Sequence, residues 1–477
     1  MPLIIPSNSI SAVGYEVDNS LRFNKASSDY LNYETGDTTT SETKSTLSAW
    51  VKRTAVGVNT VIFGHEESNS LRSAIYINDD DNFLYFQNSG NIFLTNAKFR
   101  DTSAWYHFVV TSDLTQATAS DRVKLYINGV QETSFATESY PSQNASNSVP
   151  NFGNQTIGVN IYNSSPSSSN YFDGYMAEVC FIDGQALDPT SFRQFDEDSG
   201  IWKPKDVSGL SFGTNGFYLP FENSGALGQD DSGNGNNFTV NNLTSIDQTT
   251  DTPTNNYATM NPLDNFYYGA TFSEGNLKLV QPSSTECYTT STIGISSGKW
   301  YWEVKITSSG SNKEFVGIAD KVSTASDFSP YSGNSQIISY YGFTGDSKAG
   351  STTTNSSWGD TFTTGDIIGV ALDLDNDKIY FSKNGTFQNS GDPTSGPTGT
   401  GALSVPTSPA DGHWFAQFSN ITNTGSTFEI NFGNPTFSIS SGNSDGNGMG
   451  NFEYAVPSGY YALNTKNLSE YGWCYVY

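Results

Sequence analysis

The sequence predicts an all-β protein built from two tandem antiparallel modules of the jelly-roll or β-sandwich type. Aromatic residues make up 14% of the 477 residues, so Tyr, Phe and Trp supply much of the buried surface, as they do in sheets. The 45 glycines, with many Ser, Thr and Asn residues, are typical of turns and exposed strand faces. The chain also exceeds the length at which one core keeps growing, so at least two domains are expected.

The balance of charge excludes two classes of partner. The chain carries 48 acidic and 22 basic residues, which gives a formal net charge of −26. This field repels phosphate backbones and anionic lipid headgroups, so we expect neither nucleic-acid binding nor membrane insertion. We attribute the acidity to solubility in a salty or extracellular medium.

Calcium affinity is the alternative explanation of the acidity, because clustered carboxylates are ligands of Ca²⁺ in proteins. The aspartates within residues 79–81 and 373–377 are the places where such a site is expected, although both segments look more like hairpin turns. No other cofactor is predicted. The three cysteines are far apart and odd in number, which predicts neither a disulfide framework nor a metal site: Cys180, Cys287 and Cys474.

The N-terminal residues 1–11 are predicted to be an attachment segment. Leu3, Ile4 and Ile5 form a short apolar run between two prolines, without the basic leader of a signal peptide. An ordinary edge strand is the alternative interpretation of this run.

The first sandwich is predicted over residues 12–200, where side chains alternate as they do in strands. Leu47, Ala49 and Val51 face one way, and the residues between them face the other. The segments 105–111 and 171–181 are further strands.

Turn sequences separate the strands of this region. The polar segment 78–82 lies between the apolar runs 75–77 and 83–86, which predicts a hairpin. A second hairpin is predicted at Asn128-Gly129, because both central positions of the favoured two-residue turn need positive φ. Residues 134–172 are rich in Ser, Asn, Thr and Pro and are predicted to be long surface loops.

Three blocks of this region carry a resemblance. In order they read W-Y-H-F-V-V-T, V-K-L-Y-I-N-G-V and F-D-G-Y-M-A-E-V-C-F-I-D-G-Q-A-L. Together they resemble the laminin-G-like, concanavalin A-like lectin/glucanase superfamily over nearly the whole module. The resemblance implies a jelly-roll sandwich and leaves the ligand open, because the superfamily contains lectins, glycosidases and structural modules.

Residues 201–259 are predicted to be a loop-rich connector. Gly, Asn and Asp dominate residues 225–242, and polar residues with a proline fill residues 249–256. We expect this segment to contact a module only through a few aromatic side chains such as Trp202, Phe217 and Tyr218.

The second sandwich is predicted over residues 260–437. Its clearest strand, 299–306, places Trp300 and Trp302 on the core face. The blocks G-K-W-Y-W-E-V-K-I, V-G-I-A-D and G-D-I-I-G-V-A-L-D-L-D-N-D-K-I-Y-F-S-K-N-G resemble the SPRY (B30.2-like) domain. The resemblance implies two antiparallel sheets packed face to face, with a binding surface of loops at one edge.

Residues 438–477 are predicted to form a separate C-terminal segment. Its sequence P-S-G-Y-Y-A-L-N-T-K-N-L resembles a short tail that often follows SPRY modules in phage proteins. Residues 473–477, which are rich in aromatic side chains, are expected to dock onto a module or a neighbouring subunit.

The sequence predicts no catalytic site. A retaining glucanase needs two closely placed carboxylates, and the nearest Glu-x-Asp pattern starts at Glu16 but has Leu21 where the second glutamate is required. Glu178, Asp183 and Glu303 are interpreted as residues of a sheet edge or a solvent-exposed face.

The three histidines also lack a catalytic or metal-binding pattern. His65, His107 and His413 are too far apart for a metal-ligand spacing, and no Gly-x-Ser-x-Gly elbow lies on a strand-to-helix turn. A Ser-His-Asp triad stays open at this stage. His107 is interpreted as a strand residue whose ring is hydrogen-bonded.

Aromatic side chains in loops are the candidate ligand-binding residues. Sugar rings stack on Trp and Tyr through their C–H faces, while Asn and Asp bind the hydroxyls. The alternative for each residue is a hydrophobic lid over the sandwich core. The candidates are Tyr331, Tyr340, Tyr341 and Trp358 in the second module and Tyr162 and Tyr171 in the first.

A lectin-like module followed by a SPRY-like module on an acidic chain resembles virion surface proteins of marine tailed bacteriophages. The resemblance implies a non-enzymatic tail fibre, spike or head decoration that binds a host-surface glycan or another receptor. Its implied partners are other virion proteins and further copies of the chain, with a trimer favoured. The alternatives are a secreted bacterial cell-surface adhesin that binds carbohydrate and an intracellular SPRY adaptor that binds peptides.

Overall fold

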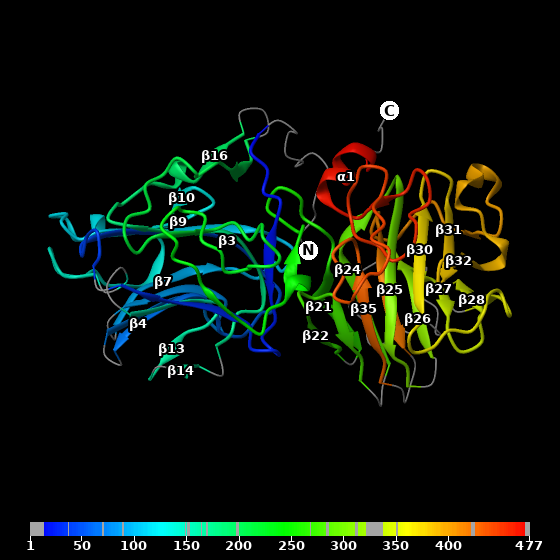
Figure 1. Cartoon of the computed structure of the whole chain (residues 1–477). Coiled ribbons are helices and arrows are strands. Elements are labelled where there is room, and N and C mark those ends of the chain that lie inside the picture. The colour runs from blue at the N-terminus through cyan, green and yellow to red at the C-terminus, as the bar shows by residue number, and fades with distance from the viewer. Residues whose placement is uncertain are drawn as a thin grey trace. The chain divides into compact units, whose positions relative to one another are not determined.

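The chain folds into two compact units in the computed structural model (Figure 1). Their described parts are residues 14–255, called the first module below, and residues 256–472, called the second module. The predicted attachment segment, residues 1–11, lies outside the described residues. Within 14–472 the description omits residues 37, 69–70, 88–89, 148, 150–152, 164, 168–169, 197–199, 268, 283–285, 311–312, 321–336, 350–351 and 421–424.

Two antiparallel sheets build the first module. Sheet A contains, in spatial order, β10 (Val130–Gln131), β9 (Val123–Ile127), β8 (Tyr106–Asp113), β3 (Lys44–Arg53), β15 (Gly174–Asp183), β1 (Ser20–Phe23) and β20 (Gln248–Thr249), and β18 (Phe217–Leu219) also pairs with β15. Sheet B contains β11 (Phe135–Glu138), β7 (Gly90–Lys98), β6 (Asn82–Gln87), β5 (Leu71–Ile77), β4 (Thr60–Ser68), β12 (Gly153–Ile157), β2 (Tyr30–Thr35) and β19 (Thr239–Asn241). Two short ribbons pair β13 (Ile161–Tyr162) with β14 (Ser165–Pro166), and β16 (Arg193–Phe195) with β17 (Trp202–Pro204).

The core of the first module lies between sheets A and B. Leu47, Ala49 and Val51 point into it from β3, as the alternation predicts, and belong to one cluster with residues of sheet B. Removal of this apolar surface from water is the main stabilising contribution to such a sandwich. The two predicted hairpins are confirmed, since β5 pairs with β6 and β9 pairs with β10. Asn128 and Gly129 have φ values of 48° and 81°.

Residues 134–172 contain strands that the sequence did not indicate. β12 lies in the interior of sheet B between β4 and β2, and β11 forms one edge of that sheet. The sequence of β12, Gly-Asn-Gln-Thr-Ile, offers no alternation of apolar side chains. Gln155 and Thr156 are nevertheless buried, and Ile157 is the only residue of this strand in the apolar core.

The segment predicted to be a connector also contains strands that the sequence did not indicate. Residues 201–255 form part of the first module, because β18, β19 and β20 pair with β15, β2 and β1. Phe217, Leu219 and Phe238 from this segment are buried in the core. Very short strands separated by Gly- and Asn-rich turns carry too little periodicity to be recognised in sequence.

The second module is a second pair of sheets. Sheet G contains β21 (Met260–Tyr267), β24 (Cys287–Ile295), β34 (Trp414–Asn420), β26 (Glu314–Ala319), β27 (Ile337–Tyr341), β28 (Ser347–Ala349) and β29 (Thr352–Asn355). Sheet H contains β22 (Thr271–Ser273), β23 (Lys278–Val280), β35 (Thr427–Asn431), β25 (Lys299–Ser308), β30 (Ile367–Asp373), β31 (Lys378–Lys383) and β32 (Thr386–Phe387), with β33 (Leu403–Ser404) on β31 and β36 (Tyr461–Ala462) on β25. The prediction of tandem antiparallel β-sandwiches is confirmed.

Helical structure is confined to short pieces in the described residues. The one α-helix is α1 (Thr465–Tyr471), and no helix of the described residues is both long and apolar enough to cross a membrane. The 3₁₀ turns are η2 (Ala119–Asp121), η3 (Pro189–Ser191), η4 (Ser245–Asp247), η5 (Gln388–Ser390) and η6 (Pro393–Thr398).

Residues 438–472 belong to the second module and are not a separate segment. β36 pairs in parallel with β25, and Leu468 of α1 joins the core between sheets G and H. The side chains of Phe452 and Tyr460 cover the outer face of sheet H, where they meet Tyr301. The prediction that residues 473–477 dock onto a module or another subunit lies outside the described residues.

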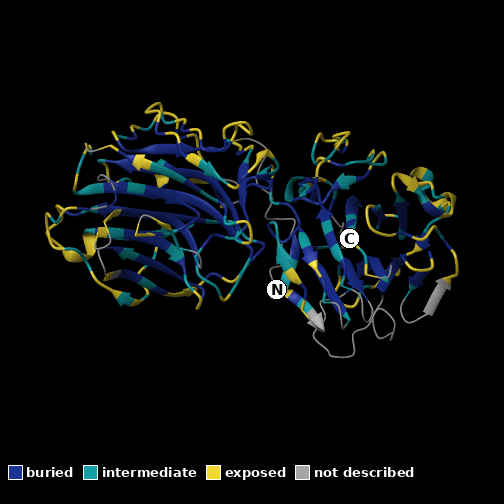
Figure 2. Ribbon diagram, turned by 60° about the horizontal axis from the view of Figure 1, so that its bottom comes forward, coloured by how far each residue is buried: buried dark blue, intermediate teal, exposed yellow. Residues whose placement is uncertain are grey.

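Both modules therefore bury residues on the outer face of a sheet as well as in the central core. Figure 2 shows this as strands that are dark blue over most of their length, with yellow confined mainly to loops. In the first module, β17 places Trp202 over Trp50 on the outer face of sheet A. Polar residues on these outer faces are consequently enclosed by protein.

Candidate functional site

The structure buries the predicted ligand-binding aromatics of the second module. Tyr340 and Tyr341 lie on β27, which corrects their expected place in a loop. Tyr340 is fully buried and meets Trp358 edge-on, with ring centroids 5.6 Å apart, so both belong to the core. Tyr341 is 3% exposed and stacks on Phe315. Tyr331 lies outside the described residues.

The two predicted ligand-binding aromatics of the first module differ in how far they are exposed to solvent. Tyr171 is 8% exposed, and its ring lies 6.1 Å from that of Tyr30. Tyr162, on β13, keeps 46% of its surface exposed and lies over the guanidinium of Arg72. Tyr162 is thus the one candidate of the described set that presents a large aromatic surface to solvent.

A cleft of about 290 Å³ opens at one edge of the first module. β9 and β10 end sheet A there, and β7 and β11 end sheet B. The space between the two sheet edges is lined by side chains from both and from η2. The lining residues are Phe93, Ser120, Asp121, Val123, Lys124, Leu125, Gln131, Glu132, Thr133, Phe135, Glu138 and Tyr140.

Aromatic rings form the apolar part of this cleft. Phe93 is 1% exposed and serves as a fixed platform. Phe135 stacks on it, with ring centroids 4.5 Å apart and an angle of 15° between the planes. Tyr140 meets Phe93 edge-on, with centroids 5.7 Å apart. Phe135 and Tyr140 are only half-buried, so part of each ring is available to a ligand.

Polar groups surround these rings. Glu132 accepts hydrogen bonds from the backbone N–H groups of Thr133 and Ser134, at 2.9 and 2.7 Å. The Tyr140 hydroxyl donates to Glu138, and burial, together with this contact, raises the pKa of Tyr140. The phenol therefore stays protonated at neutral pH.

Charge at the cleft is partly compensated. Lys124 and Asp121 form an ion pair at 3.0 Å. In the described part of the chain the cleft carboxylates of Glu132 and Glu138 have no ion-pair partner. Ring faces beside acceptors and the amide of Gln131 are the groups that bind a neutral hydroxylated ring.

Sequence reasoning missed this cleft because it assigned residues 134–172 to surface loops. A signal was present, since Phe135 and Tyr140 are aromatic residues within a polar segment. The criterion that selected Tyr162 and Tyr171, an aromatic residue among polar ones, applies equally to Phe135 and Tyr140. What the sequence did not indicate is that β11 pairs with β7 and brings Phe135 against Phe93.

Glu178 is buried, which corrects its expected position at a sheet edge. It lies at a β-bulge in β15, has a φ of 53° and is 1% exposed. The hydroxyls of Tyr218 and Tyr15 donate to its carboxylate, at 2.8 and 3.4 Å, and Arg193 lies 3.8 Å away. Burial raises the pKa of Glu178 although these partners oppose the shift. The network ties β15 to the segments that cover the outer face of sheet A.

Glu303 is also buried, whereas a solvent-exposed face was expected. Its carboxylate accepts from the backbone N–H groups of Glu453 and Tyr454, at 2.9 and 2.8 Å, and from the Tyr301 hydroxyl at 3.0 Å. Burial raises the pKa of Glu303 in spite of these donors. The residue holds the C-terminal segment against sheet H. Asp183 similarly accepts from the backbone N–H groups of Thr40 and Asn215.

His107 lies on β8 with both ring nitrogens hydrogen-bonded, as the sequence interpretation expected. Trp202 donates its indole Nε1–H to Nδ1 at 3.0 Å, and Nε2 lies 2.8 Å from the Ser48 hydroxyl. Because an indole N–H can only donate, Nδ1 must be the acceptor and the proton lies on Nε2. His107 therefore donates to Ser48, which is opposite to the role of a general base.

This arrangement predicts a pH dependence of stability. Burial, with the Arg193 charge, holds the pKa of His107 well below the usual value of 6.5. Below that pH the unfolded chain gains a proton that the folded chain does not, so stability falls by about 1.4 kcal/mol per pH unit. We expect urea denaturation between pH 6 and 5 to show this slope in the native chain and to lose it in His107→Gln. Equal slopes in both proteins would contradict the assignment.

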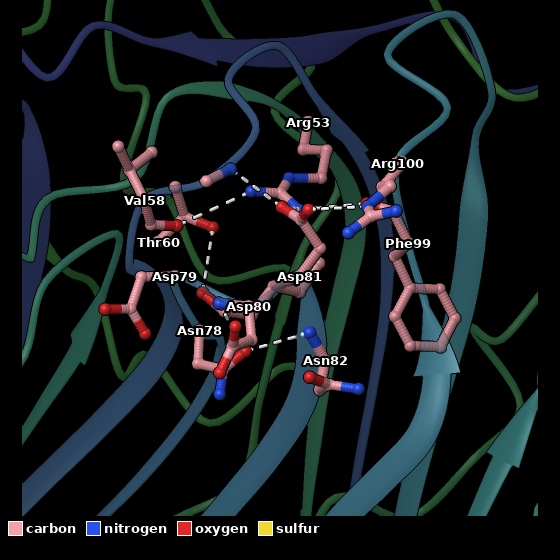
Figure 3. Close-up of polar contacts among 12 residues, drawn as sticks. Arg53, Val58, Thr60, Asn78, Asp79, Asp80, Asp81, Asn82, Phe99 and Arg100 are labelled. Carbon is pink, nitrogen blue, oxygen red and sulfur yellow. Dashed lines mark hydrogen bonds and ion pairs between the residues drawn. The ribbon is translucent and has the colours of Figure 1, made fainter.

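The aspartates at 79–81 form a hairpin turn between β5 and β6 (Figure 3). Asp81 is 4% exposed. Its carboxylate accepts hydrogen bonds from Arg53 Nη1 and Arg100 Nε, both at 2.9 Å, and from the Gly57 backbone N–H at 2.8 Å. Burial alone would raise the pKa of Asp81, but these hydrogen bonds and the Arg53 charge hold it below its usual range. The carboxylate that a calcium site would need is therefore already bound by two guanidinium groups.

The second expected calcium segment is likewise a hairpin turn, between β30 and β31. Asp373 forms an ion pair with Lys299 at 2.9 Å and accepts from the Asn376 backbone N–H. Asp375 accepts from the Gly298 backbone N–H at 2.8 Å. In the described part of the chain, no group of three or more His, Cys, Asp or Glu side chains is placed to hold a metal ion.

Comparison with known proteins assigns each module to a family. Residues 25–190 match the model of the concanavalin A-like lectin/glucanases superfamily, and residues 299–405 match the SPRY domain. The chain therefore carries a concanavalin A-like module followed by a SPRY domain. Both are β-sandwich types that typically serve as non-catalytic binding modules. A comparison with curated proteins gave no match.

The solved structures that match this chain include three distant ones. The SPRY domain of human HERC1 is 20% identical, with 36% of this chain and 96% of that chain covered and a TM-score of 0.29. A heptameric SAP-like pentraxin from Limulus polyphemus is 16% identical, with 36% and 78% covered and a TM-score of 0.28. A putative carbohydrate binding protein from Bacteroides ovatus is 17% identical, with 50% and 60% covered and a TM-score of 0.34.

Proposed function

We propose that the chain is a non-enzymatic binding protein that uses the cleft at the edge of the first module to hold a glycan. The observation that carries this proposal is the placement of Phe135 and Tyr140 beside the carboxylates of Glu132 and Glu138. The volume of about 290 Å³ is close to the lower end of small-ligand sites and suits one or two sugar rings.

The test is a glycan array with the full chain, followed by NMR titration of a neutral saccharide that binds. Phe135→Ala is expected to weaken the affinity about tenfold, because losing a stacked ring removes about 1.5 kcal/mol. Tyr140→Phe is expected to weaken it less, since only the hydroxyl is lost. Phe195→Ala removes a ring that is 53% exposed elsewhere in the module and should leave the affinity unchanged.

A chain that binds no glycan on the array, or a Phe135→Ala variant that binds as well as the native chain, would contradict the proposed site. Melting temperatures of the three variants provide the control for folding, because Phe135 also contacts Phe93.

We further propose that the chain lies on the surface of a tailed-phage virion as a fibre, spike or head decoration, and that it assembles with other copies of itself, as a trimer. Support comes from the order of the two modules, a concanavalin A-like module followed by a SPRY domain. This order is what resembles the phage surface proteins named in the sequence analysis. Antibodies against the chain should label particles produced from the genome that encodes it. Labelling of the host cell envelope instead would contradict the virion assignment.

A further inference from the structure

Arg72 contacts two aromatic rings on the outer face of sheet B. It lies on β5, and its guanidinium carbon is 5.6 Å from the ring centroid of Phe86 on β6. The same guanidinium carbon lies 4.5 Å from the ring centroid of Tyr162 on β13. A guanidinium in contact with two ring faces is attracted by both and loses much of its conformational freedom.

The donors of this guanidinium have no acceptor. Its Nε is buried without a hydrogen-bond partner, and no hydrogen bond or ion pair to Arg72 occurs in the part of the chain that the structure describes. The chain has five other arginines, and each binds a carboxylate or a carbonyl oxygen. These are Arg22 with Asp247, Arg53 and Arg100 with Asp81, Arg122 with Pro141 and Arg193 with Glu178.

The nearest acid in the sheet register does not neutralise Arg72. Glu66 on β4 is paired directly opposite Arg72, yet its Oε1 accepts the backbone N–H of Asn163 at 2.9 Å. Glu66 is 7% exposed, and no ion pair between it and Arg72 is found among the described residues. Arg72 therefore keeps its charge and its hydrogen-bonding capacity in a chain whose net charge is −26.

We propose that Arg72 and Tyr162 form a second ligand site, for a sugar that carries a carboxylate. The two Nη groups of Arg72 present paired N–H donors that match the two oxygens of a carboxylate, and the ring contacts hold the guanidinium ready to bind. Tyr162 keeps 46% of its surface exposed, and this open surface stacks on the C–H face of the sugar ring. The class of ligand is a uronic acid or another acidic saccharide.

This site is separate in composition from the cleft, since none of its residues lines that cleft. The two sites also differ in charge. The cleft has two uncompensated carboxylates and suits neutral sugars, whereas Arg72 suits anionic ones. A chain with both sites would bind an acidic polysaccharide through two different units of the polymer.

The test compares methyl β-D-glucuronide with methyl β-D-glucoside, which differ in the carboxylate, on the full chain. Isothermal titration should give at least about tenfold higher affinity for the glucuronide, because a charge-assisted hydrogen bond contributes about 1.5–3 kcal/mol. In NMR, the Arg72 side-chain Nε–H signal should shift with the glucuronide and stay in place with the glucoside. This readout needs no variant.

Variants then assign the preference to the residue. Arg72→Gln and Arg72→Lys should both abolish the preference for the glucuronide, since lysine keeps the charge but not the paired donors. Tyr162→Ala should weaken glucuronide binding. Lys98→Gln removes one positive charge from an exposed position on β7 and should leave the preference intact.

Three results would overturn the proposal. The first is equal affinity of the Phe135→Ala variant, whose cleft is impaired, for the two glycosides. The second is a preference that survives Arg72→Gln. The third is inorganic phosphate binding as tightly as the glucuronide, which would make the site a general anion site and remove the role of the sugar ring. Phe135→Ala should keep the preference, so failure of the cleft and failure of this site are distinguishable.

Discussion

Asp81→Ala is expected to lower the free energy of unfolding of the first module by about 3–5 kcal/mol. Asp81 is the carboxylate partner of Arg53, whose side chain is fully buried, and it also binds Arg100 and the Gly57 backbone N–H. Without it, the Arg53 guanidinium is left as a buried charge that keeps only carbonyl oxygens as partners. Urea denaturation followed by tryptophan fluorescence measures the loss.

Asp80→Ala is the matched control, because it removes the same charge from the neighbouring residue of the same turn. Asp80 is exposed, so the expected change is within about 0.5 kcal/mol. The pH dependence offers a second check. The pKa of Asp81 is held below its usual range, so its contribution is present above the usual pKa and disappears as the pH falls through the lowered one. Similar stabilities of the two variants would contradict the role of Asp81.

Phe452→Ala is expected to destabilise the second module by about 3–5 kcal/mol, although the residue lies outside both sheets. Phe452 is fully buried and meets Tyr301 edge-on, with ring centroids 5.2 Å apart. Its loss opens a cavity beside the outer face of sheet H. It also loosens the neighbouring backbone N–H groups of Glu453 and Tyr454 that bind Glu303.

The control for this substitution is Phe343→Ala in the same module. Phe343 is 52% exposed, so the loss of stability is expected to stay within about 0.5 kcal/mol. Thermal denaturation of the two variants beside the native chain makes the comparison. A Phe452→Ala variant that melts with the native chain would show that the C-terminal segment adds nothing to the stability of the module.

The sequence predicted the strands whose side chains alternate and the turns that demand positive φ. β3 and β25 are examples of such strands, and Asn128-Gly129 is a turn of this kind, with positive φ at both residues. These features are local, because each depends on neighbours within a few residues. The family resemblances of both modules rested on the same segments and are confirmed by the family models.

What the sequence did not predict depends on partners that are distant along the chain. β12 has no apolar alternation and becomes a central strand only because β2 and β4 flank it. Glu178 and Glu303 looked like surface residues, and segments far along the chain bury them. Burial of this kind follows from tertiary structure and leaves no pattern in the local sequence.

The candidate site shows the same division. The rule that aromatic residues among polar ones mark a binding surface found Tyr162, which the structure exposes, but it also selected Tyr340 and Trp358, which belong to the core. It overlooked Phe135 and Tyr140, whose cleft exists only where the edges of two sheets meet. Which aromatic rings are exposed is a property of sheet packing and is not encoded in composition.

The pairing of the last strand of each module with a strand far earlier in the chain sets the order in which the protein can be completed during synthesis. In the first module, β20 pairs with β1, so Ser20 cannot reach its partner Thr249 until residue 249 has left the ribosome. In the second module, β36 pairs with β25, so Trp300 cannot reach its partner Tyr461 until residue 461 has been synthesised. Contacts so distant in sequence slow folding and leave half-made sheets with open edges. Nascent chains that stop short of either closure are therefore the species that chaperones or proteases would meet.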